Sequence, residues 1–477
     1  MPSIGVLLSL VLMGFTIATL SGLGVALVNG DAQAAEVFGI LSLAYGVFSI
    51  FLYLVATSRP SQFRRAGVFI GAIAMWITLI FAAMPAFILL ENAHPVVAFF
   101  EATSASITLG TSLVPVSQMS ASMIFYRAMS AWLGGFMTLM LAVYVIGRYG
   151  VGGTPNRDLR FVLHGASRGN PRLGATFVEV AIPYIAVSIL CVIALMLVGV
   201  EPTRAVLASL SAISTNGFSG WFGQGSYLGN RSGEIILMIF MFIGASSIIW
   251  QRTILSRQIF QTHQQGESRA YLLIIFGVII VGIALSLANF PLGENVADDL
   301  FNRAFDIVAT ITTTGIVHNV SAGFSVPILF LIGLALVGGC SYSTAGGLKV
   351  FRVLAMTRHS KNEILRLVYP SQFIPGSVDT DETVFNSTKA NWSAFFSAVI
   401  FIVFAMAVLA IFGHEFTAAL TISVGAFTSV GSMVSQNLFS VEGGGVPYIS
   451  LLWISIIGIV GRVELLVLLA AFSKSRW

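Results

Sequence analysis

Four short polar segments, each ending in glycine, interrupt the apolar sequence about every hundred residues and constrain the possible folds most strongly. They are Ser-Ile-Thr-Leu-Gly ending at Gly110, Ile-Ser-Thr-Asn-Gly ending at Gly217, Ile-Thr-Thr-Thr-Gly ending at Gly315, and Phe-Thr-Ser-Val-Gly ending at Gly431. Each segment follows a short amphipathic run and precedes a longer apolar one. One such segment would be read as a turn or a small-residue helix contact, but four in register indicate a repeated structural unit.

The run before the third segment, residues 296–309, indicates how each unit lies. It is too short to span a bilayer, and it carries the charged residues Asp298, Asp299, Arg303 and Asp306. We therefore expect a short helix that enters the membrane part way and returns at the glycine segment. Non-helical backbone at that depth must be buried in protein or line a water-filled path. A positive φ at each glycine would aim carbonyls inward, where they can replace the hydration shell of a monovalent cation.

The last three residues of each segment are the candidate cation ligands. They are Thr108, Leu109 and Gly110; Thr215, Asn216 and Gly217; Thr313, Thr314 and Gly315; and Ser429, Val430 and Gly431. Leu109 and Val430 are apolar, so we expect their side chains to pack behind the backbone while their carbonyls serve the site.

The composition excludes a soluble protein, because 56% of residues are hydrophobic, 9% are charged and the mean hydropathy is +0.91. We predict an all-α polytopic membrane protein with ten spanning helices: an N-terminal pair, not a cleaved signal peptide, and two in each of four repeats with a re-entrant loop between them. The predicted divisions are the N-terminal pair and loop 1–65, repeats 66–150, 151–260 and 261–360, a cytoplasmic loop 361–390, and repeat 391–477.

Basic residues predict the orientation. Nineteen of the 24 Lys and Arg residues fall in loops on one side, which the positive-inside rule makes cytoplasmic together with both termini. Arg127, Arg204, Arg231 and Arg303 lie on the other side with an excess of acids, including Glu101, that would concentrate cations there. Residues 361–369 form a candidate amphipathic helix for the membrane interface, and this region could dock a partner or anionic lipid.

Several motifs resemble those of the Trk/Ktr/HKT potassium transporter superfamily, most closely the TrkH-like bacterial membrane subunits. Phe-Phe-Glu-Ala-Thr-Ser at 99–104 is similar to the first pore helix of the family, and residues 213–219 and 312–315 are similar to its second and third filter segments. Gly-Gly-Cys-Ser-Tyr-Ser-Thr-Ala-Gly-Gly-Leu-Lys at 338–349 and Gly-Arg-Val-Glu at 461–464 are similar to two later signatures.

The resemblance implies potassium transport in the bacterial inner membrane, with rubidium or sodium as possible competitors. It also implies a homodimer and a separate cytosolic nucleotide-binding subunit of the TrkA type, since this chain has no G-x-G-x-x-G or P-loop sequence. No cofactor and no nucleic acid is implied; the other expected partner is membrane lipid. The chain departs from the family at Leu109, where Thr is usual, at Asn216, where Gly is common, and at residues 428–432, which leaves ion preference open.

A run of Gly, Ser and Thr at residues 338–347 interrupts an apolar stretch and should form an irregular loop beneath the filter, since its helix propensity is poor. An arginine in the last apolar segment is costly at membrane depth, so we expect it to hydrogen-bond to this loop and repel cations while a gate is closed. The candidate gate residues are Gly338, Gly339, Ser341, Ser343, Thr344, Gly346, Gly347 and Arg462.

Two other classes of protein compete with a pore. A membrane enzyme would need convergent acid, base or metal groups, but no histidine pair has zinc-ligand spacing, and His94 and His414 are expected to be solvated at the outer mouth. An ion-coupled symporter with rocking halves also uses broken helices, but its repeats are typically multi-helix and often inverted. The alternative function is therefore such a symporter, or a sodium-permeable cation transporter.

Overall fold

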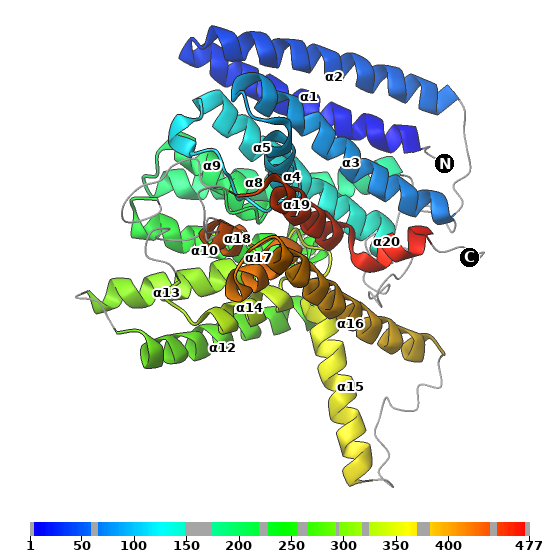
Figure 1. Ribbon diagram of the computed structural model, residues 1–477, viewed down its shortest axis with the longest axis vertical. Helices are drawn as coiled ribbons and strands as arrows, with labels where there is room; N and C mark the ends of the chain where they lie inside the picture. The colour runs from blue at the N-terminus through cyan, green and yellow to red at the C-terminus, as the bar shows by residue number, and fades with distance from the viewer. Residues whose placement is uncertain are drawn as a thin grey trace.

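The computed structural model describes residues 4–58, 65–147, 173–218, 228–255, 266–291, 295–316, 324–369, 382–438 and 446–472, and its regular structure in these ranges is helical, without strands. Two long helices, α1 (Ile4–Asn29) and α2 (Ala32–Ser58), pack against each other along one edge of the molecule (Figure 1). Their outward faces expose large apolar side chains, as expected for surfaces that face lipid. The predicted all-α membrane fold is confirmed.

Four repeats follow, each with a long helix, a short helix, a loop and a second helix. Repeat 1 contains α3 (Arg65–Leu90), α4 (Pro95–Ser106), η1 (Val116–Gln118), α5 (Ala121–Met140) and the π-helical η2 (Leu141–Ile146). Repeat 2 contains α8 (Leu173–Leu197), α9 (Pro202–Ile213), α10 (Arg231–Ala245) and α11 (Ile248–Leu255). Repeat 3 contains α12 (Gly266–Asn289), α13 (Val296–Ile311), α14 (Ile328–Val337) and α15 (Val350–Val368). Repeat 4 contains α16 (Glu382–Ile411), α17 (Phe416–Thr428), α18 (Gly431–Leu438), α19 (Tyr448–Val463) and α20 (Leu465–Phe472).

The short helices α4, α9, α13 and α17 begin where sequence signals predict. Pro95 and Pro202 stand at the first helical position of α4 and α9, where a missing N–H and a fixed φ favour helix initiation. The His94 side chain caps α4 by accepting the Val96 N–H at 3.3 Å. Asp298 and Asp299 lie in the first turn of α13, where acidic side chains favour the helix dipole.

Seven described helices are long and apolar enough to cross a membrane: α1, α2, α3, α5 with its continuation, α8, α12 and α16. The second helices of the other three repeats are interrupted. The axis bends by 110° between α10 and α11, residues 338–349 separate α14 from α15, and Glu464, with φ +60°, separates α19 from α20. The order of the described helices is consistent with the expected ten passages, with these three broken.

The region predicted to hold a separate helix at residues 361–369 is different in the structure. Helix α15 continues through these residues to Val368, and it projects away from the rest of the molecule (Figure 1). Its side chains include exposed Ile364 and Leu367, so the predicted amphipathic character belongs to the end of a longer helix.

Glycines set how closely the second helices approach the short helices. A Cβ at Gly134 of α5, Gly244 of α10 or Gly461 of α19 would lie closer than 3.0 Å to a backbone carbonyl oxygen at the C-terminal end of the short helix in the same repeat. Small residues allow this close contact between helix backbones in membrane proteins. The contact fixes the depth at which the short helices of repeats 1, 2 and 4 end.

We expect Gly134→Ala to lower the thermal stability of the purified protein in detergent, because its Cβ would collide with the Ser106 carbonyl. Overpacking of this kind costs about 1–3 kcal/mol. Gly277→Ala in α12 is the matched control, since nothing lies within 4 Å of a Cβ there. Equal melting temperatures for the two variants would contradict the packing argument.

Candidate functional site

The four glycine segments share an uncommon backbone conformation. We name residues 108–110, 215–217, 313–315 and 429–431 loops 1 to 4. The first residue of each loop has a positive φ: Thr108 at +56°, Thr215 at +51°, Thr313 at +54° and Ser429 at +60°. A left-handed conformation costs a non-glycine residue about 1–3 kcal/mol and persists only where surrounding contacts impose it. Its occurrence at four equivalent positions identifies the loops as one structural motif.

Backbone N–H groups in every loop bond back to the short helix that precedes it. The bonds run from Leu109 to the Ser104 carbonyl (2.8 Å), from Asn216 to Ser211 (3.0 Å), from Gly315 to Ala309 (2.9 Å) and from Val430 to Gly425 (2.8 Å). In a planar trans peptide the carbonyl of the preceding residue points opposite to the N–H. At least one carbonyl in each loop, such as that of Thr108, therefore points away from its own short helix.

The loops pack against one another in a closed order. A Cβ added to a loop glycine would lie closer than 3.0 Å to the backbone of the next loop: Gly110 to Asn216, Gly217 to Thr314, Gly315 to Gly431, and Gly431 to Leu109. The last contact returns to loop 1, and the Thr111 hydroxyl donates to the Gly431 carbonyl at 3.0 Å across the same junction. The four loops, far apart in sequence, thus form a ring.

The expectation that every loop glycine has a positive φ is wrong for one of them. Gly110, Gly217 and Gly315 have φ of +78°, +71° and +69°, whereas Gly431 is the first residue of helix α18. Because α18 starts directly after loop 4, Gly431 takes a helical backbone. Its glycine identity is still required, because a Cβ there would overlap the Leu109 carbonyl.

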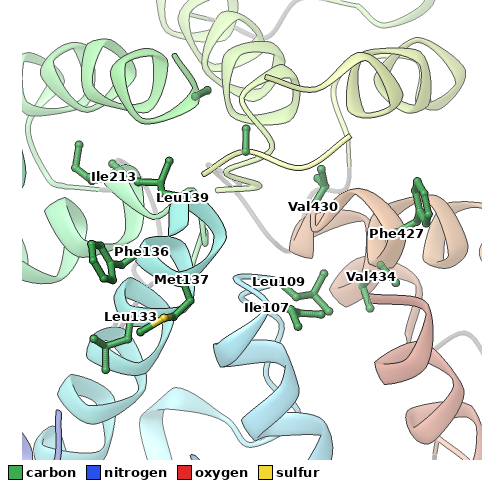
Figure 2. Packing of buried hydrophobic residues seen from close by; sticks show 14 of the residues in the cluster. Ile107, Leu109, Leu133, Phe136, Met137, Leu139, Ile213, Phe427, Val430 and Val434 are labelled. Carbon is green, nitrogen blue, oxygen red and sulfur yellow. The ribbon is translucent and has the colours of Figure 1, made fainter. Parts of the chain in front are cut away.

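Leu109 and Val430 pack as expected for apolar residues in a site built from backbone. Their side chains are buried in the hydrophobic core, with relative exposures of 1% and 0%. Figure 2 shows Leu109 next to Ile107, both projecting toward the side on which Val434 of α18 lies. These side chains stabilise the loops from outside the ring.

Residues 338–349, which we call the intramembrane loop, lie against loop 3 and the end of α9. The Thr344 hydroxyl contacts the carbonyls of Ile213 and Gly244, each at 3.0 Å, and the Gly346 N–H donates to the Thr313 hydroxyl at 2.7 Å. Ser341, Ser343 and Thr344 are all buried. The predicted irregular loop is present and is hydrogen-bonded to the ring.

Arg462 connects the intramembrane loop with loop 1. Its Nη1 donates to the Thr344 carbonyl and its Nε to the Ile107 carbonyl, both at 2.6 Å, and its Nη2 donates to the Thr108 hydroxyl. The side chain is buried, and Glu464 is paired instead with Arg352 at 2.6 Å. The sequence anticipated the contact with the intramembrane loop but not the contacts with loop 1.

Arg127 and Glu101, which the charge count assigns to the outer side of the membrane, form a buried ion pair behind loop 1. Both side chains are fully buried and bonded to each other. Charge counting assigns a residue to a side of the membrane but not to a depth, so it does not predict this burial. A signal was available: Glu101 and Asp306 each stand nine residues before the glycine of their loop.

Sequence reasoning also missed Glu267, which accepts the Ser341 N–H of the intramembrane loop at 2.7 Å.

The two histidines expected at the outer mouth differ from each other. His94 is exposed and stacks on Tyr448 with ring centroids 4.4 Å apart. His414 is buried, its Nε2 lies 3.1 Å from the Ser450 hydroxyl, and burial lowers the pKa of the imidazole. His414 therefore packs the start of α17 against α19 and is not solvated.

The chain is similar to known membrane transport proteins. A family model described as TrkH, cation transport protein, matches residues 41–476. The chain is 26% identical to the Trk system potassium uptake protein TrkH of Halomonas elongata over 99% of this chain and 98% of the relative. It is 28% identical to TrkG of Escherichia coli K12, with coverages of 92% and 94%. The crystal structure of the potassium transporter TrkH from Vibrio parahaemolyticus superposes with a TM-score of 0.82, 22% identity and 98% coverage of both chains.

Proposed function

The chain belongs to the TrkH family of cation transport proteins, and from this premise we propose that it takes up potassium through a pore lined by the ring of loops. The observation that carries the proposal is the closed packing of the four loops, because a ring of backbone carbonyls is the arrangement that replaces potassium hydration. Relatives over nearly the full length are named potassium uptake proteins.

The electrostatics of the ring favour a cation. Helices α4, α9, α13 and α17 all end at a loop, so the negative ends of four helix dipoles converge there. The carbonyls directed away from these helices then face the space inside the ring. We assign as filter the residues Thr108, Leu109, Gly110, Thr215, Asn216, Gly217, Thr313, Thr314, Gly315, Ser429, Val430 and Gly431.

The intramembrane loop and Arg462 are proposed as the gate. The loop is bonded to loop 3 through Thr313, and the Arg462 guanidinium lies at the Thr108 hydroxyl of loop 1, so both occupy the base of the ring. A fixed positive charge at that point repels permeant cations electrostatically. Opening requires the hydrogen bonds of Arg462 to Thr344 and loop 1 to break.

The setting of the pore is part of the proposal. We place the chain in the bacterial inner membrane with both termini cytoplasmic, as a homodimer that works with a TrkA-type nucleotide-binding subunit. The excess of basic residues in the loops on that side supports the orientation. No cofactor is proposed, and the ions are substrate.

Ion flux through the purified chain in proteoliposomes tests the pore. We expect potassium and rubidium to pass at channel-like rates, with sodium slower because each loop holds one glycine and so fewer ordered carbonyl rings than a Thr-Val-Gly-Tyr-Gly filter. Slow, saturating uptake with a fixed co-ion ratio would instead establish the ion-coupled symporter. Equal potassium and sodium flux would establish the sodium-permeable transporter.

We expect Gly315→Ser to shift permeability toward sodium. Its φ of +69° strains any L side chain, and its Cβ would lie 2.9 Å from the Gly431 nitrogen, so the contact of loops 3 and 4 must widen. Bi-ionic reversal potentials measure the change. Gly413→Ser is the control, because its φ of +94° imposes similar strain where nothing lies within 4 Å. An unchanged potassium-to-sodium ratio for Gly315→Ser would remove Gly315 from the filter.

We expect Arg462→Ala to raise basal flux without much change in selectivity, because the positive charge and three hydrogen bonds holding the closed gate are lost. Flux is compared at equal expression and without a cytosolic partner. Arg366→Ala, on the exposed end of α15, is the control for loss of an arginine. If Arg462→Ala conducts no more than the parent protein, Arg462 has a structural role and the gate is elsewhere.

Docking of the cytosolic subunit is tested on the projecting end of α15. We expect the double substitution Lys361→Glu and Arg366→Glu to abolish co-purification, because it reverses two charges on this surface. Arg204→Glu, exposed on the opposite side in the proposed orientation, should retain the partner. Retained binding in the α15 variant would mean that the surface contacts lipid.

A further inference from the structure

The ion pair of Glu101 on α4 and Arg127 on α5 is the most deeply buried charged pair in the described part of the chain, with 0% exposure of both side chains. A buried ion pair costs desolvation energy and is weak as a source of stability, so its contacts indicate what else it does. Apart from Phe87 of α3, which lies beside the Arg127 guanidinium, those contacts are to α4 and to residues that adjoin the ring of loops.

Glu101 holds the chain that leaves loop 1. Its Oε1 accepts the N–H of Leu113 at 2.6 Å and of Val114 at 3.3 Å, and the Ser112 hydroxyl donates to the same carboxylate at 3.1 Å. Hydrogen bonds to a buried carboxylate are short and strong compared with neutral ones. The segment that follows Gly110 is therefore tied to α4 at several consecutive residues.

Arg127 fixes the direction of one carbonyl beside the filter. Its Nη1 bonds to Glu101, and its Nη2 donates to the Thr111 carbonyl at 2.6 Å, an oxygen that also accepts the Ser104 hydroxyl at 2.5 Å. This carbonyl is thereby directed toward α4 and α5 and not into the ring. The planar fork of arginine serves the two partners from separate nitrogens in a fixed geometry, which the single ammonium nitrogen of lysine does not reproduce.

The same pair is linked to loops 2 and 4 through one residue each. The Arg127 guanidinium lies 4.7 Å from the ring centroid of Phe218, the residue directly after Gly217 of loop 2. Thr111, held by Arg127 through its carbonyl, donates its hydroxyl to Gly431 of loop 4 at 3.0 Å. One ion pair therefore contacts the residues that directly follow loops 1 and 2, and it reaches loop 4 through Thr111.

The repeats differ at this position. Asp306 is the equivalent of Glu101 in repeat 3, where its Oδ2 accepts the Ser325 hydroxyl at 3.2 Å, whereas repeats 2 and 4 carry Ala208 and Ile422. The carboxylate is thus not a general requirement of the fold. It is present behind loops that are not adjacent in the ring.

We propose that Glu101 and Arg127 are positioning residues that set the width of the filter and so determine potassium over sodium selectivity. The proposal rests on the proposed pore. Neither residue contacts a permeating ion; they act through Thr111, the backbone after Gly110, and Phe218. Widening the junctions between loops 1, 2 and 4 would remove the advantage of the larger ion, because the fixed carbonyls would no longer match its size.

The test is the bi-ionic reversal potential of the full-length chain in proteoliposomes, with potassium inside and sodium outside. The main variant is the double substitution Glu101→Leu and Arg127→Leu, which removes both charges together and leaves no unpaired buried ion. The control is Asp299→Leu with Arg303→Leu, whose guanidinium is 2% exposed and bonds to the Pro291 carbonyl and Asp299 away from the loops.

We expect the potassium-to-sodium permeability ratio of the Glu101 and Arg127 double variant to fall about tenfold, the factor that corresponds to one hydrogen bond to a charged group. The control should keep the parent ratio. Arg127→Lys retains the charge but does not reproduce the geometry that holds Glu101 and Thr111 together, so its ratio should be intermediate; it carries the test if the double variant does not fold.

A parent-like ratio in Arg127→Lys and in a folded double variant would overturn the positioning role, even if both melt at lower temperature. An equal loss of selectivity in the Asp299 and Arg303 control would overturn it as well. Failure of the pore itself gives a different result, because the parent protein would then show no potassium-dependent reversal potential.

Discussion

The N–H and C=O groups of non-helical backbone at membrane depth must find hydrogen-bond partners within the protein. The rest of this structure depends on that constraint. Each loop meets it in the same way: its N–H groups bond to the preceding short helix, and its glycine lets the next loop approach without an intervening Cβ. Four loops that each contact the next through a glycine can close only as a ring. In repeats 1, 2 and 4 the second helices then pack against the short helices through Gly134, Gly244 and Gly461, which fixes these loops at one depth.

The intramembrane loop obeys the same constraint with different partners. Two of its N–H groups bond back to Leu334 and Leu336 of α14, and others bond to Ala245, Glu267 and Thr313. Ala245, Glu267 and Thr313 belong to other elements, so the loop is held in part by contacts that a movement could exchange. The loops of the ring, bonded locally to their own helices, are not held in that way. This difference suits the intramembrane loop to move and the loops of the ring to remain fixed.

Periodic and local features of the sequence predicted the fold well, because they report local physics. Proline and capping residues placed the starts of α4 and α9, and the glycine spacing identified the repeats. The breaks at Ser246 and Glu464 were not foreseen, since each depends on tertiary contacts and not on an evident Gly or Pro run. The left-handed residues Thr108 and Ser429 were missed for the same reason: threonine and serine give no signal for positive φ.

The backbone loops of the candidate site and the role of Arg462 could be predicted from the sequence, whereas the buried pair of Arg127 and Glu101 could not. Arg462 stood out because an arginine in an apolar segment needs a partner inside the protein. Arg127 did not stand out, because it lies within seven residues of a polar stretch and the charge count assigned it to the outer side of the membrane. Its burial is explained only by the Thr111 carbonyl, Phe218 and Glu101, which all contact its guanidinium.

Two arginines thus act on loop 1 from different sides. Arg462 bonds to Ile107 and Thr108 before Gly110, and Arg127 bonds to Thr111 after it. Loop 1 is therefore the point in the ring where the proposed gate and the positioning ion pair are coupled through a few residues of backbone.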